Sequence, residues 1–369
     1  MRLVRVIGHD GKVPATAPAA QVRQRTFQVR FGTLSYIFLR IFAQGGVVKS
    51  VELSSVARRV VEDYLGIATG ERFLIVTDTR TGPLLAPTLA GHALALGADP
   101  VIVVMTPRSR SGEEPPSPIA AAMVEADVVL AAASRSCYHT EAKGAAQANG
   151  TRGLFNAPSD DNAWIDGAMT ADFLQIREVA LRLADALRGG SQVRVTSPAG
   201  TDVTMSIEGR EPKGWLTGIC REPGQVSALP GGEVSLPPVE GTTDGRIVIE
   251  RVMTYIGAVH EPVVWTVRGG LVSDIAGGAE AERLRQHIDG VENATNIGEL
   301  GIGLNPLARI THDITESKKR LGTAHLAMGD SAGGYGGTVV SDVHLDGIVM
   351  TPTIEVDGRV IASDGQVLV

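Results

Sequence analysis

Between residues 51 and 190, apolar runs alternate with segments of helical spacing, and this alternation strongly limits the possible folds. The runs are Arg72–Thr77, Pro100–Met105, Asp127–Ala131 and Gly153–Phe155, and helical patterns lie between them. Continuous apolar strands separated by helices are typical of a parallel sheet that is covered on both faces, so Pro100–Met105 should be a buried strand. We therefore expect a doubly wound α/β domain here.

The pattern changes after residue 200, where short strands dominate. Val193–Ser197 and Val203–Ile207 flank a Gly-Thr-Asp turn and predict a hairpin. A helix is expected at Glu280–Ile288. Further strands are expected at Arg246–Arg251, Val263–Arg268, Leu271–Ile275, Val339–Leu345, Thr353–Val356 and Arg359–Ile361. The sequence thus predicts an α/β domain over residues 51–195 and a largely antiparallel β (α+β) metal-binding domain over residues 196–369.

The first 50 residues differ from the rest in charge. They contain eight Lys or Arg residues and one acidic residue. The apolar segment Leu34–Phe42 is too short to span a bilayer, and no signal-peptide pattern is present. We interpret residues 1–50 as a basic extension outside the fold. It is a targeting arm, a disordered tail or, as we favour, sequence translated from upstream of the true start.

Composition excludes several classes of protein. With 43% hydrophobic and 20% charged residues, the chain is neither disordered nor fibrous. A net charge of −7 argues against a general nucleic-acid binder. The two cysteines cannot build a disulfide framework or a Cys-based zinc site, so a cytoplasmic protein is expected. The segment after the first apolar run is Thr77–Gly82 and lacks a dinucleotide or phosphate-loop fingerprint.

Isolated charged or imidazole side chains in apolar or glycine-rich segments are the candidate metal ligands. On a strand, Asp342, His344 and Asp346 would share one face. His325, Glu299 and Glu233 each stand alone among small or apolar residues. Taken singly, each has an ordinary explanation: a polar surface stripe, a hydrogen-bonded core histidine, or a glutamate reaching solvent.

Taken together, Glu233, Glu299, His325, His344 and Asp346 offer nitrogen and oxygen donors that suit a pair of divalent ions such as Zn²⁺, Co²⁺ or Mn²⁺. Two such ions acidify a water molecule and polarise a carbonyl, which is hydrolytic chemistry. Cys137 and His139 are too close on one segment to orient for proton transfer. His139 and His92 are instead candidates to line a cleft.

The segments Pro230–Val234, Glu299–Pro306, Gly322–Gly329 and His344–Asp346 resemble motifs of the thermophilic metallo-aminopeptidases of the aminopeptidase T type. The resemblance covers about Val51 to the C-terminus. It implies an α/β domain, a C-terminal metal domain, a homodimer and a small peptide substrate. It also implies that the five residues above bind two metals, with Glu299 helping to activate water.

Two departures bring in a second hypothesis. The family's tyrosine, seven residues after the first motif histidine, is replaced by Ala332, and Tyr335 is the nearby candidate to substitute for it. The interval between His325 and His344 is also short. That shortening resembles the 2,5-dihydroxypyridine 5,6-dioxygenases, a divergent branch that uses one iron(II), although that branch lacks the glutamates and one histidine. The motifs favour a hydrolase over the dioxygenase alternative and over a non-enzymatic scaffold.

Overall fold

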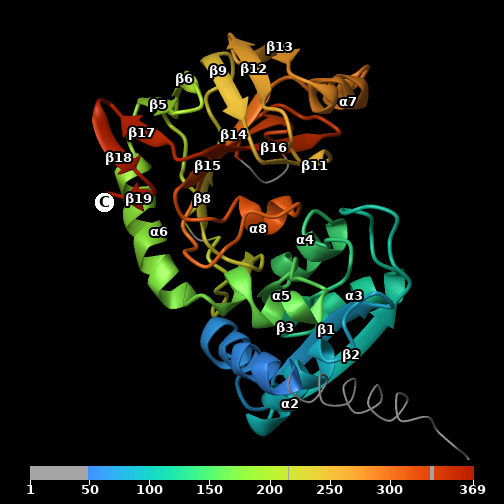
Figure 1. Ribbon diagram of the computed structural model, residues 1–369. Helices are drawn as coiled ribbons and strands as arrows, with labels where there is room; N and C mark the ends of the chain where they lie inside the picture. Colours follow the sequence, from blue (N-terminus) through green and yellow to red (C-terminus); the bar gives the residue numbers. More distant parts are fainter. Residues whose placement is uncertain (1–48, 215, 333–335) are drawn as a thin grey trace, which may run out of the picture. The chain divides into compact units, whose positions relative to one another are not determined.

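The computed structural model describes residues 49–369 apart from residues 215 and 333–335 (Figure 1). The expectation for residues 1–50 therefore lies almost wholly outside the described residues. The described residues belong to one compact unit. Residues 49–59 are α-helical and continue into a π-helical turn, Val60–Tyr64.

A parallel sheet follows, as expected, with strand order β2-β1-β3-β4-β7. Its strands lie side by side in the lower part of Figure 1. They are β1 (Arg72–Asp78), β2 (Asp99–Met105), β3 (Val128–Ala131), β4 (Arg152–Leu154) and β7 (Val226–Ser227). The helices of this region are α2 (Leu85–Ala95), α3 (Ser117–Glu125), α4 (Glu141–Ala148), α5 (Asp161–Ile165) and α6 (Phe173–Leu187), with a 3₁₀ turn at Gly167–Thr170. The doubly wound α/β expectation is confirmed.

Strand β2 departs from the expectation of a buried strand. It pairs with β1 alone and forms one edge of the sheet, so Val101, Ile102 and Val104 are exposed. An apolar run does not distinguish a central strand from an edge strand, because that depends on the order in which strands pair. At the other edge, β7 comes from beyond residue 195, so this sheet draws on both predicted domains, whose boundary stays a prediction.

Two antiparallel sheets make up most of the rest of the described chain. The first has the order β11-β10-β16-β15-β14-β8, and the second has the order β13-β12-β9-β6-β5-β17-β18-β19. The first contains β8 (Glu233–Leu236), β10 (Val252–Met253), β11 (Gly257–Ala258), β14 (Ile297–Gly303), β15 (Thr323–Gly329) and β16 (His344–Met350). The second contains β5 (Gln192–Thr196), β6 (Asp202–Ser206), β9 (Asp244–Ile249), β12 (Val263–Arg268), β13 (Leu271–Ala276), β17 (Thr353–Val356), β18 (Arg359–Ser363) and β19 (Gln366–Val367). Two helices, α7 (Ala279–Ile288) and α8 (Ile314–Ser317), interrupt these strands.

The strand expected at Val339–Leu345 is wrong in its bounds. The structure begins β16 at His344, and Asp342 is an exposed residue before it. Residues 330–343 instead form bends and irregular loop in their described part, where the backbone N–H groups of Asp330 and Ser331 donate to the carbonyls of Val343 and Val339. The hairpin and the remaining strands expected after residue 190 are confirmed.

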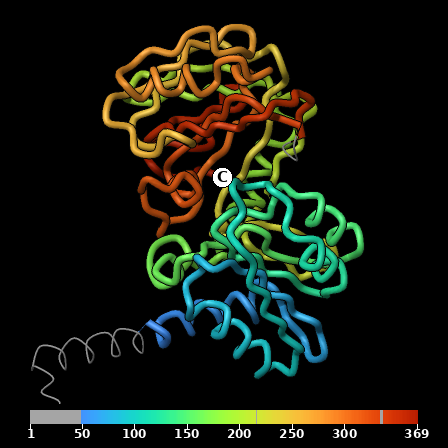
Figure 2. Tube along the Cα trace, turned by 90° about the vertical axis from the view of Figure 1, so that its right-hand side faces the viewer, coloured from blue at the N-terminus to red at the C-terminus, as the bar shows by residue number. Residues whose placement is uncertain are grey.

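One face of the six-stranded sheet packs into the main core. Leu300, Leu326 and Val349 point to that face and are fully buried. A side chain at Gly347 would meet Ile249 and Trp265 of the eight-stranded sheet, so the two sheets touch closely there. Figure 2 shows the yellow and orange chain of β9 and β12 beside the red chain of β16. The opposite face is left for polar side chains.

A partly buried ion pair stabilises the start of the parallel sheet. Arg152 donates to both carboxylate oxygens of Glu71 at 2.7 Å and to the carbonyls of Leu65 and Gly66. Burial raises the pKa of Glu71, but the hydrogen bonds from Arg152 outweigh it and hold that pKa below its usual value. Arg152 is therefore a buried cation whose charge is balanced by one carboxylate.

We expect Glu71→Gln to lower the free energy of unfolding by about 3 kcal/mol at pH 7, because it leaves the Arg152 charge unpaired. The exposed pair Arg194–Asp202 is the control, and Asp202→Asn should cost less than about 1 kcal/mol. The stabilisation by Glu71 is present above its unfolded pKa and is lost as pH falls through the lower folded pKa. Urea unfolding between pH 3 and pH 7 measures both effects, and equal costs for the two variants would contradict the buried-pair interpretation.

The structure excludes the two cysteines as reactive thiols. Cys137 and Cys220 are buried free thiols, and burial raises their pKa to about 11 and about 12, so neither is an activated nucleophile.

Within the described residues, no helix combines the length and hydropathy needed to cross a bilayer.

Candidate metal centre

Four adjacent strands bring the predicted ligands together. Glu233 begins β8, Glu299 lies on β14, His325 on β15, and His344 and Asp346 on β16. The sheet order β16-β15-β14-β8 places these strands next to one another although the residues span more than a hundred positions. All five residues lie on the face that does not pack into the core.

The strand register explains why they share this face. His325 pairs with Gly301, and Ala327 pairs with both Glu299 and Asp346. Directly paired residues point to the same side of an antiparallel sheet. Gly301 and Ala327 therefore surround the polar side chains with the smallest possible neighbours and leave them room.

The donor atoms form a tight cluster. His344 Nε2 lies 3.1 Å from Glu299 Oε2 and 3.5 Å from Asp346 Oδ1. His325 Nε2 lies 3.7 Å from Glu299 Oε2, 3.6 Å from Glu233 Oε2 and 4.0 Å from Asp346 Oδ1. Ligand atoms about 2.0–2.2 Å from a shared ion are separated by such distances. Glu299, His344 and Asp346 each place one donor atom within 4.8 Å of the others.

Unsatisfied buried atoms show that the residues fit a cation. Among the described residues, neither ring nitrogen of the fully buried His325 has a hydrogen-bond partner, and the same holds for Glu233 Oε2 and Asp346 Oδ1. Buried polar groups without partners are costly. A Cβ on Gly301 would lie 2.0 Å from Cε1 and Nε2 of His325, so the absence of a side chain there makes the space for the ring. A divalent ion would satisfy His325 Nε2 together with the nearby carboxylate oxygens, while Nδ1, on the other side of the ring, would not reach that ion.

His344 is oriented from its other side. Its Nδ1 bonds the carbonyl of Asp330 at 2.8 Å, which leaves Nε2 directed at the carboxylates. Metal-bound histidines commonly hold their second nitrogen in this way. This arrangement supports the prediction that His344 and Asp346 act from the same strand face.

The site contains cations that sequence reasoning missed. Lys318 Nζ lies 3.3 Å from Asp346 Oδ2 and 3.9 Å from Glu233 Oε2, and Lys319 Nζ contacts Glu233 Oε1. Lys213 reaches the same region, and burial lowers its pKa to about 8. In the sequence, Lys318 and Lys319 stand in the charged run Glu316–Arg320, which is typical of a solvated surface.

The pKa shifts reflect this mixture of charges. Burial raises the pKa of Glu299, but Lys318, His325 and His344 outweigh it and hold that pKa well below its usual value. The pKa of Asp346 is lowered against burial by Lys318 and His344. Burial lowers the pKa of His344, but its bonds to Asp346 and Glu299 prevail and raise it to about 10. In this arrangement a proton on His344 occupies the place of a metal.

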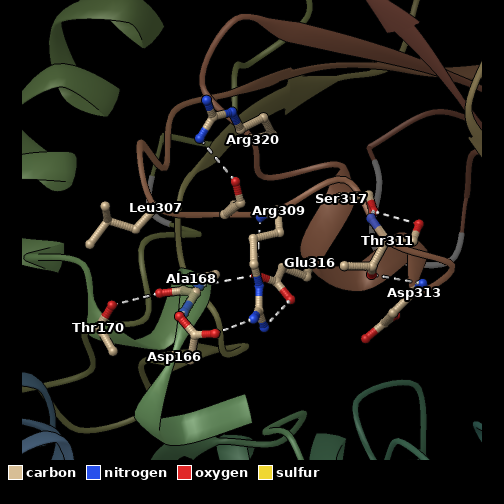
Figure 3. A network of polar contacts seen from close by, with 12 residues as sticks. Asp166, Ala168, Thr170, Leu307, Arg309, Thr311, Asp313, Glu316, Ser317 and Arg320 are labelled. Atoms are coloured by element: carbon tan, nitrogen blue, oxygen red, sulfur yellow. Dashed lines mark hydrogen bonds and ion pairs between the residues drawn. The ribbon is translucent and has the colours of Figure 1, made fainter. Parts of the chain in front are cut away.

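A polar network holds the α8 segment that precedes the two lysines (Figure 3). Glu316 accepts hydrogen bonds from the side chain and backbone of Arg309 and from the backbone N–H of Ala168. Arg309 also donates to Asp166 at 2.6 Å. This network connects α8 to the turn after α5, so Lys318 enters the site from a fixed backbone.

The ligand face opens into a cavity of about 660 Å³. That volume is in the range of small-molecule sites. Tyr138 and His139, from the loop between β3 and α4, also line it, as expected for His139. His92 instead bonds Ser54. Tyr335 lies outside the described residues, so its proposed role stays a prediction.

The fold and the site define a class of protein: an α/β chain with a buried cluster of histidines and carboxylates suited to a divalent metal, open to a small-molecule cavity. The family model NicX, described as 2,5-dihydroxypyridine 5,6-dioxygenase, matches residues 56–369. The chain belongs to this family. A comparison with curated proteins found no match.

Two solved structures share the fold. The structure of 2,5-dihydroxypyridine dioxygenase from Pseudomonas putida KT2440 has a TM-score of 0.75 at 18% identity, covering 86% of this chain and 97% of that one. Wild-type AmpT from Thermus thermophilus has a TM-score of 0.62 at 16% identity, covering 86% and 99%. At these identities, both comparisons show the fold alone. The family match favours the dioxygenase alternative over the aminopeptidase that the motifs favour.

We expect metal affinity to rise with pH up to about 10, by about tenfold per unit, because the ion must displace the proton on His344. The measurement is titration calorimetry with Zn²⁺ in buffers of different ionisation enthalpy, which also counts the released proton. A binding constant that does not change between pH 6 and pH 8 would contradict this assignment.

Proposed function

We propose that this protein is a metal-dependent dioxygenase that opens a hydroxylated pyridine or a closely related aromatic ring. The observation that carries the proposal is the family match over residues 56–369, together with a donor set that fits a metal ion. Two histidines with a carboxylate are a characteristic ligand set of non-haem iron(II) oxygenases. Here His325, His344 and Asp346 supply that set, with Glu299 beside them.

The residues around the donor set suit such a substrate. An iron(II) ion held there would allow dioxygen and the ring to react. Lys213 and Lys318 line the cavity and would stabilise a deprotonated ring hydroxyl group by charge. Glu299 is placed to accept a proton near the ligands, with its oxygen 3.1 Å from His344 Nε2. The cavity wall formed by Tyr138 and His139 would limit access of water to the ring.

A second candidate is the metallo-aminopeptidase, and one specific observation favours it. Glu233, Glu299, Asp346 and the two histidines all converge on the same face, and these five are the ligand set implied by the aminopeptidase T resemblance. In that case Glu299 would activate water between two ions. The implied homodimer is part of this proposal as well.

The deciding experiment loads the purified full-length protein with iron(II) under anaerobic conditions and measures oxygen uptake with 2,5-dihydroxypyridine. Parallel samples loaded with Zn²⁺, Co²⁺ or Mn²⁺ are tested for hydrolysis of leucyl anilides. We expect oxygen uptake that depends on both iron and the dihydroxypyridine. Hydrolysis of the anilide without any oxygen uptake would reject the dioxygenase and support the second candidate.

A further inference from the structure

Two lysine ammonium groups occupy the outer side of the candidate metal site. Lys318 Nζ lies between two carboxylates, 3.3 Å from Asp346 Oδ2 and 3.9 Å from Glu233 Oε2. Lys319 Nζ contacts the other oxygen of Glu233, and the Lys319 side chain is 6% exposed. A cation therefore already bridges Glu233 and Asp346 on this side.

The inner side of the site has the opposite character. His325 Nε2, Glu299 Oε2, His344 Nε2 and Asp346 Oδ1 face one another, and among the described residues neither ring nitrogen of His325 has a hydrogen-bond partner. Two of the outer carboxylate oxygens, Asp346 Oδ2 and Glu233 Oε1, are matched by lysine. Glu233 Oε2 lies between the two sides, 3.9 Å from Lys318 Nζ and 3.6 Å from His325 Nε2.

The net charge of the buried groups differs between a site with one bound ion and a site with two. The carboxylates of Glu233, Glu299 and Asp346 oppose the ammonium groups of Lys318 and Lys319, and these five groups carry one net negative charge before any metal binds. Lys213, which lines the same cavity, adds a further positive charge when it is protonated. One divalent ion brings this cluster to one net positive charge, and a second brings it to three. Excess charge of one sign in a buried site is strongly unfavourable. A second ion bound about 2.0–2.2 Å from Glu233 would also displace the lysines.

The lysines are held by the backbone. Ser317 Oγ bonds both the backbone N–H and the carbonyl of Thr311, and the carbonyl of Lys319 accepts a bond of 2.7 Å from the backbone N–H of Asn305. Asn305 in turn donates its side-chain amide to Ala168 and Gly231, just before Glu233. The same network positions Glu233 and Lys319 against each other, so their contact is built into the fold.

We propose that Lys318 and Lys319 take the electrostatic place of a second metal ion, so that this site binds one divalent ion. His325, His344 and Asp346 hold that ion with Glu299 beside it, and Glu233 is a partner of the lysines. The inference rests on the proposed metal site and deepens it, because the number of ions separates oxygenase-type from dinuclear hydrolase-type metal chemistry.

The test measures bound metal directly. The protein is dialysed against Mn²⁺ or Zn²⁺, and metal per chain is determined by mass spectrometry together with the binding constant. We expect one ion in the wild type and a second ion in Lys318→Met/Lys319→Met, because that variant leaves Glu233 and Asp346 without their cations. The control is Lys143→Met. Lys143 lies on α4 with its ammonium group over the ring of Tyr138, and this variant should bind one ion.

A second variant keeps the test valid if the double lysine variant does not fold. Glu233→Gln/Lys319→Met removes one charge of each sign, so the net charge is unchanged. We expect it to bind one ion with an affinity within about tenfold of wild type, whereas removing a true ligand would cost far more than the 10–100-fold of an outer partner. Circular dichroism and thermal unfolding verify that each variant is folded.

The outcomes separate this inference from the proposed function. Two ions in the wild type, one ion in a folded Lys318→Met/Lys319→Met, or a loss above about 100-fold in Glu233→Gln/Lys319→Met would each overturn the inference. One ion in the wild type without any oxygen uptake would reject the proposed dioxygenase and leave the role of the lysines standing.

Discussion

Glu299→Gln is expected to lower turnover by about 10²–10⁴-fold, the usual contribution of a positioned base. The Glu299 carboxylate accepts from His344 at 3.1 Å and lies 3.7 Å from His325, at the centre of the donor cluster. Glutamine keeps the size of the side chain but removes the negative charge and the basicity. Because the substitution is nearly isosteric, the fold should be retained.

Steady-state oxygen uptake and metal content together distinguish two roles for Glu299, proton transfer and metal binding. A lower turnover with unchanged metal content assigns Glu299 to proton transfer, and loss of the metal assigns it to the ligand set. The matched control is Glu282→Gln on the exposed face of α7, whose partner is Arg285, and it should leave turnover within about twofold of wild type. A fully active, metal-loaded Glu299→Gln would remove Glu299 from the site.

Gly301→Ala is expected to lower metal affinity by about 10²-fold, although alanine adds one methyl group. The new Cβ would lie 2.0 Å from the Cε1 and Nε2 atoms of His325. His325 is fully buried, so its ring cannot move away without displacing the packed strands around it. Zn²⁺ titration measures the affinity, and thermal unfolding measures the accompanying strain.

Gly91→Ala in helix α2 is the control for this substitution. No described atom lies within 4 Å of a Cβ at Gly91, so the variant should keep its metal affinity and gain up to about 1 kcal/mol of stability from helix propensity. If Gly301→Ala binds metal like the wild type, His325 does not reach the ion from the position described above.

Hydrophobic periodicity in the sequence was sufficient to predict most of the helices and strands. The strands β1, β3 and β4 and the helices between them follow the apolar runs closely. The same periodicity did not predict β14 or β15, because glycine and alanine obscure the alternation of apolar and polar residues in these strands. Both strands alternate in fact: Leu300 and Leu326 face the core, while Gly301 and Ala327 face the site. Glycine has low strand propensity, and its function there is to leave space.

The candidate ligands were predictable because each is an isolated polar residue in an apolar segment. The presence of Lys318 and Lys319 in the site was not predictable, because both belong to a charged run that is typical of a solvent-exposed surface. The two lysines directly follow α8 and contact Glu233 and Asp346, which are 28 or more residues away in the chain. Spacing along a chain carries no information about such a contact.

By itself, the sequence determined the α/β region, the antiparallel C-terminal region and the residues with ligand chemistry, because hydrophobic periodicity and residue type act locally. The tertiary structure alone decided that β2 is an edge strand, that β14 and β15 lie between β8 and β16, and that two lysines face the carboxylates. Each of these depends on which strands pair and which face is buried, and pairing is settled by packing between residues distant in sequence.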